Sequence, residues 1–214
     1  DIIQRGSVLT LPWTGDPLTP FVPALPVDGD RQVERLDPED VPLHTIPVLP
    51  LGYNAASEIL SRMTGEAGPE DWQGGLNLTY RIIGGPDLTV RVRVNQPKAL
   101  TRAVNVVGTL EGTEFPDEWF ILGSHYDPWG FGAVDPNGGT SMLLALAEAL
   151  GELAEQGCGP RRSIMIAHWD AEEYGIIGSA EWVEAFLPEL TTNAIAYINA
   201  DSAVSGPNFN ASSS

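Results

Sequence analysis

Short apolar runs alternate with amphipathic stretches in the second half of the chain. Four runs have the length and composition of buried strands: residues 103–110, 118–123, 163–169 and 194–200. In residues 140–155 and 179–190, apolar side chains recur every three or four positions, which is typical of helices. Strands that alternate with helices predict an α/β fold, in which a mainly parallel sheet is flanked by helices.

The first half of the chain has a different pattern. Prolines are frequent in residues 1–50, which disfavours long helices and central strands there. Residues 54–63 have helical spacing. Residues 76–94 alternate apolar and polar positions on either side of Gly84-Gly85-Pro86-Asp87, which predicts a β-hairpin. The change of pattern near residue 98 predicts a domain boundary there.

The composition is strongly acidic. The chain has 29 acidic and 11 basic side chains, which give a formal net charge of −18. Nucleic acids and anionic membrane surfaces bind basic patches, so we expect neither as a partner. No apolar run of the sequence is long enough to cross a bilayer. Cys158 is the only cysteine, which excludes an internal disulfide and a cysteine-based zinc site.

Two features concern the cellular route of the protein. Glycosylation sequons occur at Asn77-Leu78-Thr79 and Asn210-Ala211-Ser212, and they indicate a secretory route and a glycoprotein. The chain starts at Asp1 without a signal sequence and ends at Ser214 without a capping element. We therefore expect both ends to lie within a longer protein, whose remainder would pack on this chain.

Potential metal ligands follow three of the predicted strands and one loop. They are His125 with Asp127, Asp170 with Glu172 and Glu173, Asp201, and Asp135 in the loop. The carboxyl ends of strands in an open α/β sheet meet at one edge, so these groups should converge. Converging carboxylates repel unless cations are present, and mixed Asp, Glu and His ligands suit zinc. Of two adjacent glutamates, one can bind a metal while the other accepts a proton from water.

The motifs that contain these residues resemble a known family. They are His125-Tyr-Asp127, Gly132-Ala-Val-Asp-Pro136, Trp169-Asp-Ala-Glu-Glu-Tyr-Gly175, Gly178-Ser179 with Glu181-Trp182, and Tyr197-Ile-Asn-Ala-Asp201. In sequence order they are similar to the signatures of the glutamate carboxypeptidase II family of zinc peptidases, which also contains the transferrin receptor. The resemblance implies that residues 1–98 are the C-terminal part of a β-rich protease-associated (apical) domain. Residues 99–214 would then be the N-terminal part of an aminopeptidase-like zinc peptidase domain.

The resemblance also implies two zinc ions and a role for each candidate residue. His125 and Asp201 would bind one zinc, Glu173 the other, Asp135 would bridge both, Glu172 would be the general base, and Asp127 would hold the His125 ring. The remaining histidine ligand of the family would lie beyond residue 214. A water between the two ions would attack the peptide carbonyl, and Glu172 would pass its proton to the leaving amine.

A calcium site and a substrate contact are implied in the same way. Glu181 and Glu184 match family residues that bind a structural calcium, together with main-chain carbonyls of Thr19 and Val22. From spacing alone, a glutamate pair three residues apart indicates only a solvated helix face. Ser7 stands where family carboxypeptidases have an asparagine that contacts the terminal glutamate of the substrate, so a preference for glutamate stays open.

Two further histidines have structural interpretations. His168 lies within a predicted strand, on the same face as Ile164 and Ile166, and is interpreted as a packed residue or a support for metal ligands. His44 has prolines around it and no acidic companion in a ligand-like spacing, so it is interpreted as structural.

The resemblance implies a zinc-dependent exopeptidase that removes a terminal residue from small peptides, similar to glutamate carboxypeptidases. Two alternatives stay open: an aminopeptidase of the same fold, and a non-catalytic, receptor-like homologue that binds a protein partner. Every implied ligand within the chain is present, which favours the enzyme. The resemblance further implies a homodimer that is secreted, vacuolar, or the extracellular part of a membrane-anchored protein.

Overall fold

The computed structural model describes residues 12–44, 46–95, 97–204, 206–207 and 211–212. These residues form two compact units: residues 43–99 form one, and residues 12–42 together with 100–214 form the other. The boundary predicted near residue 98 would assign residues 12–42 to the first unit, whereas in the structure they belong to the second. They group with the second unit because their main chain is bound there, for example by the hydrogen bond from Gly15 N to Gly175 O, 2.9 Å long.

The second unit contains a four-stranded sheet in the order β1-β3-β2-β4. Its strands are β1 (Val106–Leu110), β2 (Phe115–His125), β3 (Arg162–Trp169) and β4 (Ala194–Asn199). β2 is parallel to both β3 and β4, and β1 is antiparallel to β3. The four strands lie where the apolar runs predict them, and the mainly parallel α/β sheet is confirmed.

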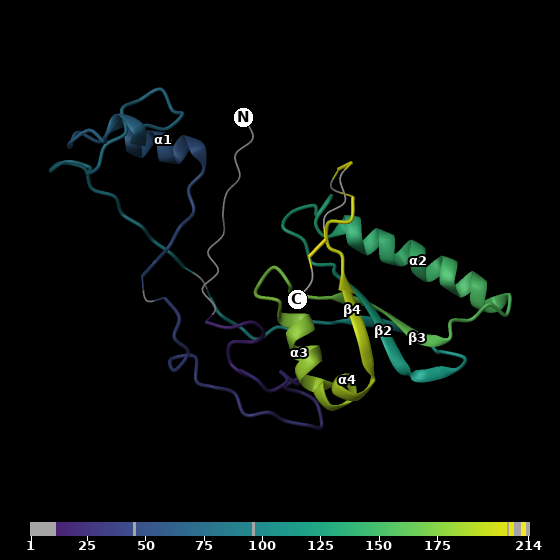
Figure 1. The fold of residues 1–214 in the computed structure, drawn as a ribbon. Helices are drawn as coiled ribbons and strands as arrows, with labels where there is room; N and C mark the ends of the chain where they lie inside the picture. The colour runs from purple at the N-terminus through teal and green to yellow at the C-terminus, as the bar shows by residue number, and fades with distance from the viewer. Residues whose placement is uncertain (1–11, 45, 96, 205, 208–210, 213–214) are drawn as a thin grey trace. The chain divides into compact units, whose positions relative to one another are not determined.

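Helices cover both faces of this sheet (Figure 1). α2 (Asn137–Glu155) contacts β2 and β3 on the face of Ser124, whose side chain lies close to Gly139 of the helix. α3 (Ile177–Ala185) and α4 (Leu187–Asn193) lie on the opposite face, where Trp182 of α3 packs on Trp169 with ring centroids 5.2 Å apart. None of the described helices is long and apolar enough to cross a membrane.

The helix predicted over residues 179–190 is interrupted. The main chain leaves the helical region at Phe186, where φ is −116° and ψ is 19°, and Pro188 lies in the first turn of α4. Proline has no N–H to donate and its ring clashes with the preceding turn, so it is tolerated at a helix start but not inside a continuous helix. Residues 179–190 therefore form two short helices instead of one.

The strand register places the ends of three strands at one edge of the sheet. His125 at the end of β2 is paired with Trp169 at the end of β3, and Gly123 is paired with Asn199 at the end of β4. The residues that follow β3 and β4 therefore begin at the level of His125. The sequence predicts that the potential metal ligands converge at this edge.

The first unit contains little regular structure. Its helices are α1 (Tyr53–Ser61), which confirms the predicted helix over 54–63, and the short 3₁₀ turn η1 (Glu70–Trp72). The hairpin predicted over residues 76–94 is wrong, because the described part of this unit contains no strand and only an isolated bridge between Ala67 and Arg81. The chain around Arg81 pairs with the segment around Ala67 instead, through Ile82 N to Glu66 O at 2.9 Å. An unsupported two-stranded hairpin is marginal in water.

The close approach of α2 to the end of β4 gives a test of the fold. A Cβ on Gly139 would lie 1.5 Å from the carbonyl oxygen of Ala200, whereas a Cβ on Gly151 of the same helix meets nothing within 4 Å. We expect Gly139→Ala to lower the free energy of unfolding by about 1–3 kcal/mol or more, because the main chain must shift. Gly151→Ala should raise it by up to about 1 kcal/mol through helix propensity. Urea unfolding measures both, and equal effects would contradict the described packing.

Candidate functional site

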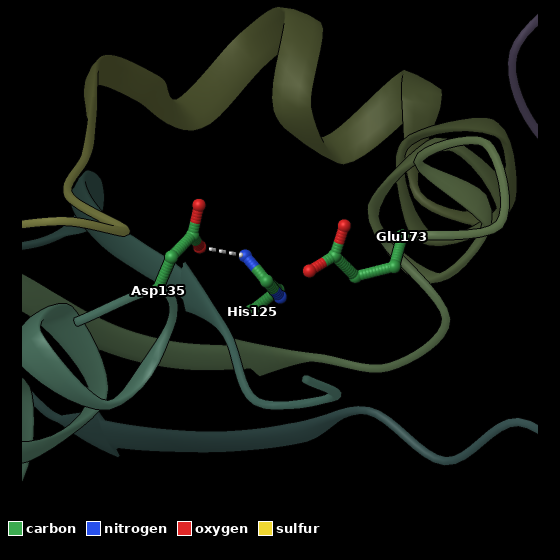
Figure 2. A group of neighbouring side chains, drawn as sticks. All are labelled: His125, Asp135 and Glu173. Carbon is green, nitrogen blue, oxygen red and sulfur yellow. Dashed lines mark hydrogen bonds and ion pairs between the residues drawn. The ribbon is translucent and has the colours of Figure 1, made fainter. Parts of the chain in front are cut away.

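His125 is the centre of the group of side chains at the carboxyl edge. It is the last residue of β2, its side chain is only 2% exposed, and its Nε2 lies 2.8 Å from Oδ1 of Asp135. Figure 2 shows the carboxylates of Asp135 and Glu173 on either side of the imidazole. One ligand atom from each of these three residues lies within 4.8 Å of the other two, so they could hold a metal ion.

A tight loop before α2 carries Asp135 to His125. Gly132 has a φ of +58°, a conformation that glycine adopts without strain. A Cβ at Gly132 would lie 2.6 Å from Cβ of Pro128. The loop is closed by hydrogen bonds from Asn137 N to Gly132 O, 3.0 Å, and from Gly138 N to Val134 O, 2.8 Å. The glycine therefore permits the turn that places Asp135 over the end of β2.

Asp127 links the histidine to the two glutamates. Its carboxylate accepts the main-chain N–H of Glu172 at 2.9 Å and that of Glu173 at 3.2 Å. Its main-chain carbonyl lies 2.9 Å from Nδ1 of His125, while its carboxylate is farther away, at 3.5 Å. Asp127 thus contacts the imidazole, as predicted, chiefly through its carbonyl. The carboxylate holds the turn after β3, a role that the sequence does not reveal.

The contact with the Asp127 carbonyl decides how the imidazole can act. A carbonyl oxygen only accepts, so Nδ1 of His125 carries a proton there and Nε2 is the atom left for a metal. Burial lowers the pKa of His125, but the hydrogen bond with Asp135 and the charges of Asp201 and Glu172 raise it above its ordinary value overall. A divalent cation would replace the second proton as the partner of these carboxylates.

Glu172 lies beside the same nitrogen. Its Oε2 is 3.8 Å from Nε2 of His125, and its side chain is 30% exposed. Burial raises the pKa of Glu172, and the charges of Asp201 and Glu173 add to the rise, while His125 opposes it. A carboxyl group with a raised pKa next to a possible metal site is suited to accept and return a proton.

Asp201 and Asp170 occupy different positions from the three clustered ligands. Asp201 accepts the main-chain N–H of His125 at 3.2 Å through Oδ1 and the side-chain amide of Asn199 at 2.7 Å through Oδ2. It lies next to His125 but outside the group of three mutually close ligand atoms. The carboxylate of Asp170 bonds the main-chain N–H groups of Val104 and Ala171 and so serves to hold the chain.

A second cluster joins α3 to residues 16–24. Glu181 accepts the main-chain N–H groups of Asp16 and Ala24, both at 2.5 Å. Oε2 of Glu184 and Oγ1 of Thr19 are buried without a hydrogen-bond partner among the described residues. Burial raises the pKa of both glutamates, and the charge of Glu181 raises that of Glu184 further. These oxygens are the kind that Ca²⁺ binds.

The structure places the remaining candidates as follows. His168 is 9% exposed on β3, and neither of its ring nitrogens has a partner within the described part of the chain. Burial lowers the pKa of His168, which agrees with a packed, neutral histidine. His44 is exposed and belongs to the first unit. Ser7 and Asn210 lie outside the described residues. The main-chain carbonyl of Thr19 accepts the N–H of Val22 at 3.3 Å.

Comparison with known proteins gives a consistent result. Residues 105–212 match the sequence profile of Peptidase family M28. A glutamate carboxypeptidase 2 homolog of Caenorhabditis briggsae is 42% identical over 93% of this chain. The aminopeptidase NAALADL1 of Rattus norvegicus is 39% identical over 94%, and the probable glutamate carboxypeptidase LAMP1 of Arabidopsis thaliana is 43% identical over 98%. The chain spans 26%, 28% and 29% of the lengths of these relatives, respectively.

The buried neutral His168 gives a test by pH. The unfolded chain binds a proton at this histidine below about pH 6.5, while the folded chain does so only at lower pH. The contribution to stability is therefore complete above about pH 6.5 and is lost as the pH falls below it. His168→Phe should remove this component, so that its free energy of unfolding falls less steeply between about pH 7 and 5. Equal slopes in urea unfolding of the two proteins would contradict the assignment.

Proposed function

The chain belongs to peptidase family M28, and on that basis we propose that the protein is a zinc-dependent exopeptidase that hydrolyses terminal peptide bonds of small peptides. One observation carries the proposal: His125, Asp135 and Glu173 bring a nitrogen and two carboxylates within 4.8 Å of one another at the carboxyl edge of a mainly parallel sheet. In α/β sheets this edge is where ligands bind. The general base candidate Glu172 lies at the same place.

The donor set supports zinc as the metal. One imidazole with carboxylates suits zinc, and the Nδ1 contact with the Asp127 carbonyl makes Nε2 of His125 the nitrogen that would bind it. In the proposed arrangement, His125 and Asp201 would hold one zinc, Glu173 would hold the other, and Asp135 would contribute to both.

Glu172 is proposed as the general base. Bound zinc would polarise the peptide carbonyl and make water a stronger acid. Glu172 would accept the proton of the attacking water and deliver it to the leaving amine, since its carboxylate is 3.8 Å from the histidine nitrogen that faces the site. Asp127 would keep Glu172 and Glu173 in place by accepting both of their main-chain N–H groups.

We propose carboxypeptidase action, similar to the glutamate carboxypeptidases, with aminopeptidase action as the alternative. The relatives have names of both kinds, so an N-acetylated dipeptide is the informative substrate. A carboxypeptidase accepts it, whereas an aminopeptidase needs a free amino terminus. The implied homodimer and secretory location stay expectations from the resemblance.

We also propose that Glu181 and Glu184 help to bind a structural calcium. The proposal rests on the buried oxygens of Glu184 and Thr19, which have no partner among the described residues. A cation there would join α3 to residues 16–24, where Glu181 already binds two main-chain N–H groups. Its role would be to stabilise the second unit and not to take part in hydrolysis.

The calcium proposal predicts a metal-dependent melting temperature. Calcium at about 100 times its dissociation constant should add about 2.7 kcal/mol to the stability of the protein. Glu184→Gln should abolish most of this gain, whereas Glu189→Gln on the exposed part of α4 should leave it unchanged. Differential scanning calorimetry with and without Ca²⁺ measures the effect. An identical calcium response of the protein and of Glu184→Gln would rule out the site.

The catalytic proposal predicts different outcomes for the adjacent glutamates. Glu172→Gln keeps the shape of the side chain but removes the proton acceptor, so turnover of an N-acetylated dipeptide should fall by about 10²–10⁴-fold. Its zinc content should stay at the level of the parent protein, because Glu172 is not a ligand. Glu173→Gln should instead lower the zinc content itself. Zinc is measured by atomic emission and turnover by amine release.

Two results would count against this proposal. Unchanged turnover in Glu172→Gln would remove it as the base. A parent protein that binds zinc but cleaves neither N-acetylated nor free peptides would favour the receptor-like alternative. Cleavage of free peptides alone would favour the aminopeptidase.

A further inference from the structure

A series of hydrogen bonds links β3 to β4 across β2 and ends at Asp201. Nε1 of Trp169 donates to the hydroxyl of Tyr197 at 2.9 Å, and this hydroxyl donates to Oδ1 of Asn199 at 2.6 Å. Nδ2 of Asn199 then donates to Oδ2 of Asp201 at 2.7 Å. The other oxygen of Asp201 accepts the main-chain N–H of His125 at 3.2 Å. These hydrogen bonds thus connect β3, β4 and the end of β2.

Gly123 makes this crossing possible. Trp169 is on β3 and Tyr197 is on β4, so their side chains meet across β2, which lies between these strands. A Cβ on Gly123 would lie 2.3 Å from the Tyr197 hydroxyl and 2.6 Å from Nε1 of Trp169. β2 therefore has a glycine, Gly123, where a larger residue would block the hydrogen bond between Trp169 and Tyr197.

The side-chain chemistry fixes which group donates and which accepts in each of these hydrogen bonds. An indole N–H only donates, so the Tyr197 hydroxyl accepts from Trp169 and has its own proton free to donate. Oδ1 of Asn199 accepts this proton, which turns the amide N–H₂ toward Asp201. A carboxylate only accepts, so the reverse orientation of the amide would place two acceptors against each other. Tyr197 and Asp201, the two partners of Asn199, thus require the same orientation of its amide.

We propose that Trp169, Tyr197 and Asn199 act as positioning residues for Asp201 and so set the zinc affinity of the proposed site. The inference rests on the proposed function, in which Asp201 is a zinc ligand. Hydrogen bonds to the carboxylate from Asn199 and from the His125 main chain hold it beside His125. Orientation of a ligand before the metal binds raises affinity, and loss of such a partner costs about 10–100-fold in other metal sites.

The alternative is that these bonds only hold the strands together. Trp169 is 3% exposed and packs on Trp182, so it has such a packing role in any case. Tyr197 is half-exposed and Asn199 is exposed. Their truncation therefore removes little buried surface, and an effect on zinc affinity can be separated from an effect on folding.

The test compares zinc affinity in single and double variants of the protein. Asn199→Ala should weaken zinc binding by about 10–100-fold, and Tyr197→Phe should weaken it less, because the amide is still present but free to turn over. Since the two groups act in series, the double variant should bind zinc no more weakly than Asn199→Ala, within about 2-fold. Tyr80→Phe is the control, since it removes a tyrosine hydroxyl that accepts the main-chain N–H of Leu76 in the first unit.

Competition with a chromophoric chelator measures the affinity, and the melting temperature of the metal-free proteins reports folding. Weaker zinc binding in metal-free proteins of equal melting temperature supports the positioning role. Unchanged affinity in Asn199→Ala, or losses that multiply in the double variant, overturns it while the proposed function stands. If the unsubstituted protein takes up no zinc, the proposed metal site and this inference fail together.

Discussion

The parallel pairing of β2 with both of its neighbours is the constraint on which the site depends. Because β2, β3 and β4 run in one direction, the end of β2 with His125 lies at the same edge as the residues after β3 and β4. Those residues include Glu172, Glu173 and Asp201. An antiparallel strand ends at the opposite edge of the sheet, as β1 does, so ligands after such a strand would lie far from His125. Glycines then adjust the close approaches, with Gly139 admitting Ala200 and Gly123 admitting the Trp169–Tyr197 bond.

A bound cation would balance the charges that meet at this edge. Hydrogen bonds from two main-chain N–H groups stabilise the Asp127 carboxylate, and N–H groups of His125 and Asn199 stabilise that of Asp201. Asp135 and Glu173 face the imidazole (Figure 2), and the pKa values of His125 and Glu172 are both raised. N–H groups thus hold Asp127 and Asp201, whereas Asp135 and Glu173 would bind the metal directly.

The sequence predicts the parts that depend on local pattern. Short apolar runs with polar residues just beyond them predict the strands and the candidate ligands, and the helical spacing of apolar residues predicts α2. Other parts depend on distant contacts: the segment 76–94 pairs elsewhere than its alternation predicts, and residues 12–42 group with the second unit. The roles of the Asp127 carboxylate and of Asn199 need the register between strands, which a single sequence does not contain. Pro188 is visible in the sequence and could have predicted the interruption between α3 and α4.

We propose that the carboxyl edge of the sheet is a zinc centre built around His125. Anomalous diffraction at the zinc edge, from crystals of the protein grown with Zn²⁺, tests it most directly. We expect an anomalous peak about 2.0–2.1 Å from Nε2 of His125 and about 2.0–2.2 Å from a carboxylate oxygen of Asp135. Crystals that contain bound zinc but show no anomalous peak between His125, Asp135 and Glu173 would contradict it.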